Sequence, residues 1–270
     1  MLRNVLVPAD VGAATDALAG NPAAALLAGG TLLMPRINND VAPIETLVSA
    51  RNLGIAGIDV ADGQARVGAA TTLTDLGEDD RLAALRPVVE SIASPIIRNL
   101  ATVGGNLFAR QPYGDLAVTL LALDAVAEIA GRQGSREAPV AEILEQRVSE
   151  GEIVVALRFA IPAEGTFFWT KAMRRKLNSA AIVAVAAAIE TGDDGTVSSA
   201  RIALGGAGTR PIRARSAEAA LLGKPLDEQS VREAAERALD DAEPFTDAYA
   251  SAWYRARVLP VHLRRAILGA

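Results

Sequence analysis

The 270-residue chain contains no cysteine and a single histidine, His262. Without cysteine it can form no disulfide and can supply no thiolate to a catalytic step or to an iron–sulfur cluster. One histidine cannot build a zinc site by itself, and nothing near His262 resembles the nucleophile of a Ser-His-Asp triad. We therefore expect His262 to be a surface or packing residue.

Long apolar runs and an excess of positive charge are also lacking. The longest apolar run, residues 180–189, is half the length of about 20 residues that spans a bilayer. The first ten residues hold no apolar core typical of a signal peptide, so a cytoplasmic location is expected by default. The net charge of −5 argues against a surface that binds nucleic acid or anionic membranes.

Apolar residues make up 50% of the chain although aromatic residues account for only 4%, so a large core of small aliphatic side chains is expected. The length allows one large domain or two smaller ones. Two basic groups, Arg174-Arg175-Lys176 and the set Arg255, Arg257, Arg264 and Arg265, are expected to be solvated faces or contacts between subunits.

Two glycine pairs carry most of the functional signal. The first lies in Ala28-Gly29-Gly30-Thr31-Leu32-Leu33, directly after the strand-like residues 23–28. The second lies in Thr102-Val103-Gly104-Gly105-Asn106. Missing Cβ atoms let backbone N–H groups approach a phosphate closely, although either loop alone could be an ordinary turn.

A carboxylate and an apolar helix follow the second loop, in PYGDLAVTLLALDA at residues 112–125. Asp115 directly precedes the apolar stretch 116–124, which favours a helix with Asp115 as its N-cap. A contact between Asp115 and a ligand is compatible with that position.

The order of these three features resembles the FAD-binding medium subunits of molybdenum hydroxylases, the family of carbon monoxide dehydrogenase medium subunits and xanthine dehydrogenase flavin domains. The resemblance implies an α+β fold. Its first part is a two-part FAD-binding domain of the vanillyl-alcohol-oxidase type, and its second a C-terminal domain with a three-stranded antiparallel sheet and helices. Where the family's first loop usually carries His-Ser or Thr-Asp, this chain has Thr31-Leu32. Backbone N–H groups can still cradle a phosphate there.

The resemblance also assigns roles to individual residues. Both loops would wrap the FAD pyrophosphate with Asn106 closing the second, and Asp115, thirteen residues after Thr102, would contact FAD. Ile92, most simply a helix core residue, would line the site, and Val154 in the GEIVV segment would approach the isoalloxazine. Lys171 could stabilise negative charge on the reduced ring, although Asn178-Ser179 stand where the family usually has an aspartate. The expected cofactor-binding residues are Ala28, Gly29, Gly30, Thr31, Leu32, Leu33, Ile92, Thr102, Val103, Gly104, Gly105, Asn106, Asp115, Val154 and Lys171.

The segment Pro162-Ala163-Glu164-Gly165 separates two parts of the chain with different sequence patterns and predicts a domain boundary. Residues 1–163 would form the FAD-binding domain, with subdomains of about 1–54 and 55–163, and residues 164–270 the C-terminal flavoprotein domain. In the latter we expect strands at 166–173, 180–190 and 197–204, a packed turn at 205–208, and helices at 216–222, 227–241 and 245–268.

The function that the resemblance implies is an FAD-binding electron-transfer subunit. It would pass electrons from iron–sulfur clusters on a partner to an external acceptor such as NAD, quinone or oxygen. The partners would be a large molybdenum-cofactor subunit and a small [2Fe-2S] subunit, in a dimer of heterotrimers. Two alternatives stay open: a stand-alone flavin-dependent oxidoreductase acting on a small molecule, for which no catalytic base is identified, and a scaffold that has lost its flavin, suggested by Leu32 and Asn178-Ser179.

Overall fold

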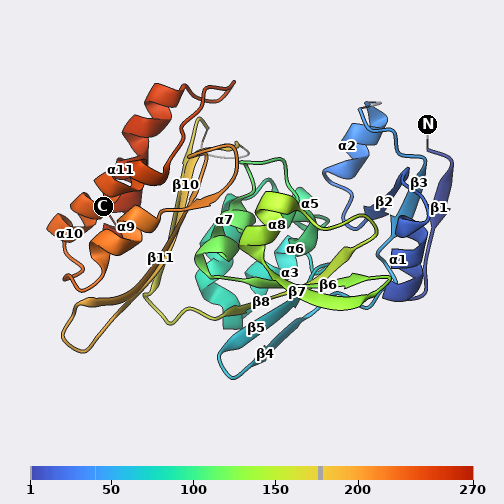
Figure 1. The fold of residues 1–270 in the computed structure, drawn as a ribbon, viewed down its shortest axis with the longest axis horizontal. Coiled ribbons are helices and arrows are strands. Elements are labelled where there is room, and N and C mark those ends of the chain that lie inside the picture. Colours follow the sequence, from blue (N-terminus) through green and yellow to red (C-terminus); the bar gives the residue numbers. More distant parts are fainter. Residues whose placement is uncertain (1, 40, 176–178, 270) are drawn as a thin grey trace. The chain divides into compact units, whose positions relative to one another are not determined.

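The computed structural model describes residues 2–39, 41–175 and 179–269, which fold into two compact units (Figure 1). Unit 1 consists of Met1–Ala83, Ser94–Ala109 and Ala125–Ala160. Unit 2 consists of Ala84–Ala93, Arg110–Asp124 and Ile161–Ala270. Two segments from the first half of the chain therefore fold with the C-terminal part. Within the described residues, no helix is both long enough and apolar enough to span a membrane.

A small parallel sheet opens unit 1. Its strands, in spatial order, are β1 (Asn4–Leu6), β3 (Thr46–Ser49) and β2 (Ala24–Leu27). Helix α1 (Val11–Ala19) begins after Asp10, whose carboxylate caps it by accepting a hydrogen bond from the Ala13 amide at 2.8 Å. Small apolar residues of α1, including Ala14 and Leu18, form a core with Val48 of β3.

The larger sheet of unit 1 is antiparallel. In spatial order it consists of β4 (Ile58–Ala61), β5 (Gln64–Gly68), β8 (Ile153–Ala160), β6 (Val126–Gly131) and β7 (Gly134–Pro139). The short helices of this unit are α2 (Leu33–Asn38), α3 (Leu73–Glu78), α5 (Pro95–Arg98), α6 (Val103–Leu107) and α8 (Val140–Gln146). Helix α6 packs against β5 and β8 and thereby places the second glycine loop on the sheet.

Unit 2 is built on a four-stranded antiparallel sheet with the order β12 (Ile212–Arg213), β11 (Val197–Gly205), β10 (Ala181–Thr191) and β9 (Phe167–Met173). The three expected strands are present, and the two-residue β12 adds a fourth that is too short to leave a pattern in the sequence. The helices are α4 (Arg86–Ser91), α7 (Asp115–Ala122), α9 (Arg215–Leu221), α10 (Glu228–Arg237) and α11 (Ala252–Leu268). Short 3₁₀ turns lie at Asp80–Leu85, which runs from unit 1 into unit 2, and at Ala238–Asp241.

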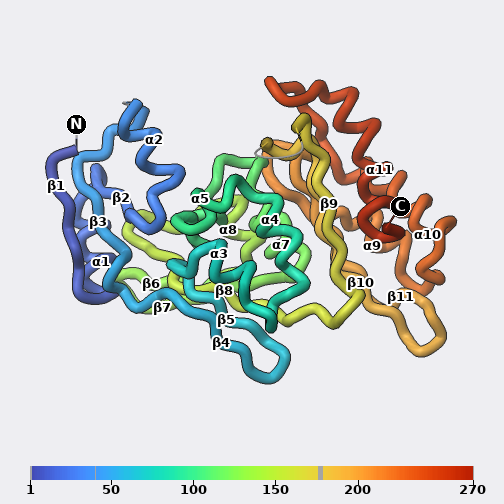
Figure 2. Tube along the Cα trace, turned by 180° about the vertical axis from the view of Figure 1, so that it is seen from behind, coloured from blue at the N-terminus to red at the C-terminus, as the bar shows by residue number. Residues whose placement is uncertain are grey.

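Helices cover both faces of this sheet. Helices α9 and α11 pack on one face and α7 on the other (Figure 2). Gly205 permits the close approach of α7, since a Cβ at this position would lie 2.7 Å from Cγ2 of Val118. Gly206, the next residue, has a φ of +72°, and a Cβ there would lie 2.3 Å from the Ile182 carbonyl oxygen, so the prediction of a packed turn at 205–208 is confirmed.

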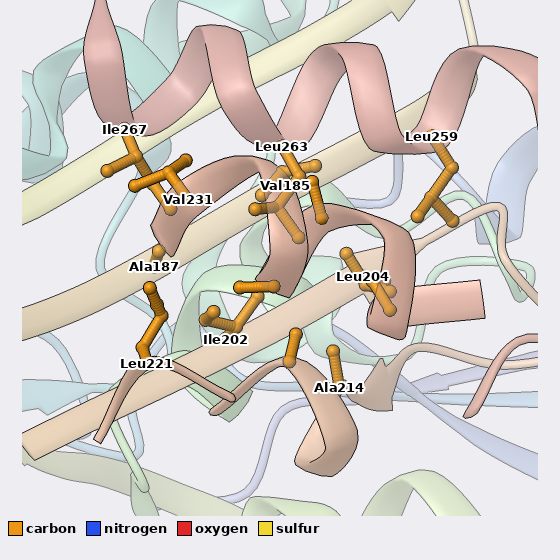
Figure 3. Packing of buried hydrophobic residues seen from close by; sticks show 14 of the residues in the cluster. Val185, Ala187, Ile202, Leu204, Ala214, Leu221, Val231, Leu259, Leu263 and Ile267 are labelled. Atoms are coloured by element: carbon orange, nitrogen blue, oxygen red, sulfur yellow. The ribbon is translucent and has the colours of Figure 1, made fainter. Parts of the chain in front are cut away.

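The core of unit 2 consists mainly of small aliphatic side chains. Leu259, Leu263 and Ile267 recur every four residues along α11 and face apolar residues of β10 and β11 (Figure 3). Arg255 continues the same face one turn earlier and is fully buried, so placing it among solvated or subunit-contact arginines was wrong. The helix expected from residue 245 begins only at its N-cap, Ser251.

Candidate cofactor-binding site

The first glycine loop is fixed by close packing of the backbone. A Cβ on Gly29 would lie 1.8 Å from the carbonyl oxygen of Leu100, so only glycine lets the loop rest on this segment of unit 1. Gly30 has a φ of +71°, which other residues rarely adopt. The chain then turns into α2, and the Met34 amide donates to the Gly30 carbonyl at 2.9 Å.

Five successive amides in this loop are open. Among the described residues, the N–H groups of Ala28 to Leu32 have no hydrogen-bond acceptor. Amides without an acceptor in the protein are free to donate to a bound group, and successive backbone N–H groups in a turn can form an anion-binding concavity. Because the donors belong to the backbone, the replacement of a polar side chain by Leu32, which is 48% exposed, does not remove them.

The second glycine loop is built differently from the expectation. The amides of Val103 and Gly104 donate to the carbonyls of Thr71 and Ala69, at 2.9 and 2.8 Å. Gly105 donates to the Thr102 hydroxyl at 3.1 Å, and the Asn106 amide donates to the Thr102 carbonyl. The interpretation of this loop as a second set of open amides was wrong, because these donors have acceptors inside the protein.

The glycines of the second loop serve its packing instead. A Cβ on Gly104 would lie 2.8 Å from that of Ala69, so the glycine permits α6 to rest on the end of β5. What the loop offers to a ligand is a side chain: Oδ1 of Asn106 is buried and has no partner among the described residues. Buried polar atoms are normally paired, so this oxygen fits a hydrogen-bond donor of a bound group. Val154 lies in β8, buried in unit 1.

The remaining predicted residues lie in unit 2. Asp115 is not the N-cap of its helix; Gly114 takes that place, and Asp115 is the first residue of α7. Its buried carboxylate pairs with Lys171 of β9, with 2.6 Å between Oδ2 and Nζ. The lysine also donates to the Ser91 carbonyl at 2.9 Å. Ile92, the next residue, is buried at the end of α4.

Burial raises the pKa of the Asp115 carboxyl because it disfavours the charged form, and the nearby Lys171 ammonium opposes that shift. In the described part of the chain the carboxylate has no hydrogen bond other than the one from Lys171, which leaves Oδ1 able to accept a donor. Asn178, where the family usually has an aspartate, lies outside the described residues.

A polar cluster close to Asp115 was missed in the sequence. Tyr113 donates through its hydroxyl to Asp247, which also accepts from the buried Arg255 at 2.8 Å. Burial and the hydrogen bond to Asp247 raise the pKa of Tyr113 to about 12. Although burial opposes the shift, hydrogen bonds from Tyr113 and from the amides of Ala250 and Tyr249 hold the pKa of Asp247 well below its usual range. Because Tyr113 and Asp247 are 134 positions apart in the sequence, no local pattern reveals this pair.

Comparison with known proteins identifies the family of the chain. The family model "FAD binding domain in molybdopterin dehydrogenase" matches residues 2–163, and the model "CO dehydrogenase flavoprotein C-terminal domain" matches residues 169–270. The chain belongs to this family of molybdopterin dehydrogenase FAD-binding domains. Its class is that of the FAD-binding flavoprotein subunits of oxidoreductases.

Individual relatives align over nearly the whole chain. The xanthine dehydrogenase FAD-binding subunit of Escherichia coli O157:H7 is 34% identical, over 94% of this chain and 91% of the relative. The carbon monoxide dehydrogenase medium chain of Afipia carboxidovorans is 31% identical, over 89% and 86%. A solved carbon monoxide dehydrogenase from Hydrogenophaga pseudoflava superimposes with a TM-score of 0.94 at 29% identity, covering 100% of this chain and 97% of that one.

These findings confirm the predicted family, the α+β class with an FAD-binding domain before a C-terminal flavoprotein domain, and FAD as the cofactor. The roles of individual residues and the domain boundary at residue 163 stay predictions.

Proposed function

We propose that this chain carries FAD in a molybdenum hydroxylase and passes electrons from the iron–sulfur clusters of a partner to an external acceptor. The complex would contain a large molybdenum-cofactor subunit and a small [2Fe-2S] subunit, as a dimer of heterotrimers in the cytoplasm. The absence of cysteine supports this division, since the chain has no thiolate to ligate a cluster. Residues 1–163 and 164–270 would be its two domains.

The open amides of Ala28 to Leu32 carry the proposal. Five donors without acceptors in one turn match the oxygens of a pyrophosphate, which accepts several hydrogen bonds from backbone N–H groups. The unpaired Oδ1 of Asn106 would accept a donor of the cofactor in the same unit. Thr102 and Gly104 would act indirectly, since they hold α6 in place.

Bound FAD supplies redox chemistry in one- and two-electron steps. The contribution of this chain is electrostatic and positional. Lys171 would hold the Asp115 carboxylate through its 2.6 Å contact and leave the second oxygen to a hydroxyl or ring N–H donor of the cofactor. Val154 would supply apolar contact to the ring system, and Ile92 would line the site.

The test uses the complex purified after co-expression of the chain with its partner subunits. We expect substrate to reduce both the iron–sulfur clusters and the flavin. After removal of FAD, cluster reduction should persist while electron delivery to the external acceptor stops, and added FAD should restore it. Undiminished delivery without FAD would overturn the proposal. Substrate oxidation by the isolated chain would favour the stand-alone oxidoreductase.

A further inference from the structure

Among the described residues, the N-terminus of α7 makes no hydrogen bond with a capping side chain. Its N-cap is Gly114, which has no side chain to accept from the first amides, and within residues 2–39, 41–175 and 179–269 no other side chain caps this end. Many helices gain stability and a fixed first turn from such a cap. Packing on the sheet holds α7 as a whole, and contacts on either side of Gly114 hold its first residue, Asp115.

One such contact is the Lys171 pair, which holds the Asp115 carboxylate itself. The other is made by Tyr113, on the opposite side of Gly114. Its hydroxyl donates to Oδ2 of Asp247, and its ring meets the Tyr249 ring edge to face, with 5.3 Å between centroids. Tyr113 thus ties residues 110–114 to the segment that precedes α11.

Asp247 is itself held firmly. Its Oδ1 accepts from the amides of Tyr249 and Ala250, at 2.8 and 3.0 Å, and from Nη2 of Arg255. The fully buried Arg255 guanidinium donates further to the carbonyls of Phe245, Ile182 and Gly206. Because this acceptor is satisfied from several directions and anchored in the unit 2 core, it is a rigid point of attachment for Tyr113.

We propose that Tyr113 and Asp247 are positioning residues for the FAD contact of Asp115. Their hydrogen bond fixes Tyr113, the residue before the N-cap Gly114. Lys171 holds Oδ2 of Asp115, and Oδ1 is thereby presented to FAD. The inference rests on the proposed function, because it requires that Asp115 contact the cofactor. Neither Tyr113 nor Asp247 itself needs to touch FAD.

Tyr113→Phe tests the proposal, with Tyr249→Phe as the matched control. The control removes a hydroxyl from the same cluster that forms no hydrogen bond in the described part of the structure. FAD is removed from the purified complex, and the dissociation constant for added FAD and the reduction potential of the bound flavin are measured. Both variants are also prepared with Asp115→Asn.

We expect Tyr113→Phe to raise the FAD dissociation constant by about two- to tenfold, at most the loss of one ordinary hydrogen bond between FAD and a misplaced Asp115. It should also shift the flavin potential, whereas Tyr249→Phe should change neither. In the Asp115→Asn background, Tyr113→Phe should have little further effect on FAD affinity, because it acts through that carboxylate. A purely structural role would lower thermal stability equally in both backgrounds without this coupling.

The outcomes separate the two proposals. If Asp115→Asn leaves FAD affinity and potential unchanged, the contact assumed under the proposed function is wrong, and the positioning role is overturned with it. If Asp115→Asn weakens FAD binding but Tyr113→Phe does not, or if the two effects simply add, the positioning role alone is overturned.

Discussion

Gly29→Ala should disrupt the anion-binding loop through a single methyl group. The added Cβ would lie 1.8 Å from the Leu100 carbonyl oxygen and 2.7 Å from its carbon, both backbone atoms. A carbon normally stays about 3.3 Å from such an oxygen, so the two segments must separate by roughly 1.5 Å. We expect a loss of about 1–3 kcal/mol in the free energy of unfolding.

The larger effect should fall on FAD, because the displaced loop carries the five open amides. Loss of a single amide–phosphate hydrogen bond corresponds to about tenfold or more in the dissociation constant. Thermal unfolding and fluorescence titration of the FAD-free protein measure the two effects. Gly208→Ala is the control, since a Cβ there meets its nearest atom at 3.8 Å. If Gly29→Ala bound FAD as tightly as the wild type, the assignment of this loop to the pyrophosphate would be refuted.

Three further perturbations test other parts of the site. Lys171→Met leaves the buried Asp115 carboxylate without its partner and should lower the free energy of unfolding in denaturant by about 3–5 kcal/mol. Lys224→Met, which breaks an exposed ion pair, should have a much smaller effect, and equal losses would contradict this. The folded-state pKa of Asp247 is depressed, so its stabilising contribution is present above the ordinary aspartate pKa and is lost as the pH falls below about 4. The melting temperature should therefore drop on acidification, less steeply in Asp247→Asn, and identical pH profiles would count against the assignment. Asn106→Ala removes an unpaired buried oxygen, so the melting temperature of the FAD-free protein should be unchanged or raised while FAD binding weakens. A lowered melting temperature with unchanged FAD binding would refute a cofactor role.

Local sequence patterns predicted much of the fold. The apolar run after residue 180 becomes β10, an interior strand of the unit 2 sheet, because such a run is a property of near neighbours in the chain. One boundary was misjudged for a physical reason. A helix was expected from residue 245, yet Tyr249 and Trp253 are 40% and 69% exposed and the helix begins after Ser251.

For the candidate site, the sequence indicated positions but not the contacts that the residues there make. Glycine pairs indicate close approach but not what approaches, and in the second loop the neighbour of Gly104 is Ala69. Likewise, the position of Asp115 predicted a cap, whereas the partner that accounts for its burial, Lys171, lies 56 residues further along the chain. Pairings at such separations follow from the tertiary fold, and no spacing rule along the sequence contains them.

The central claim is that this chain holds FAD, and the most direct measurement is the FAD content of the purified protein. The visible spectrum should show bound flavin, and heat release should yield one FAD per chain, both for the chain in its complex and after reconstitution of the isolated chain with FAD. No flavin under either condition, even with FAD in excess, would contradict the account and leave a scaffold that has kept the fold without the cofactor.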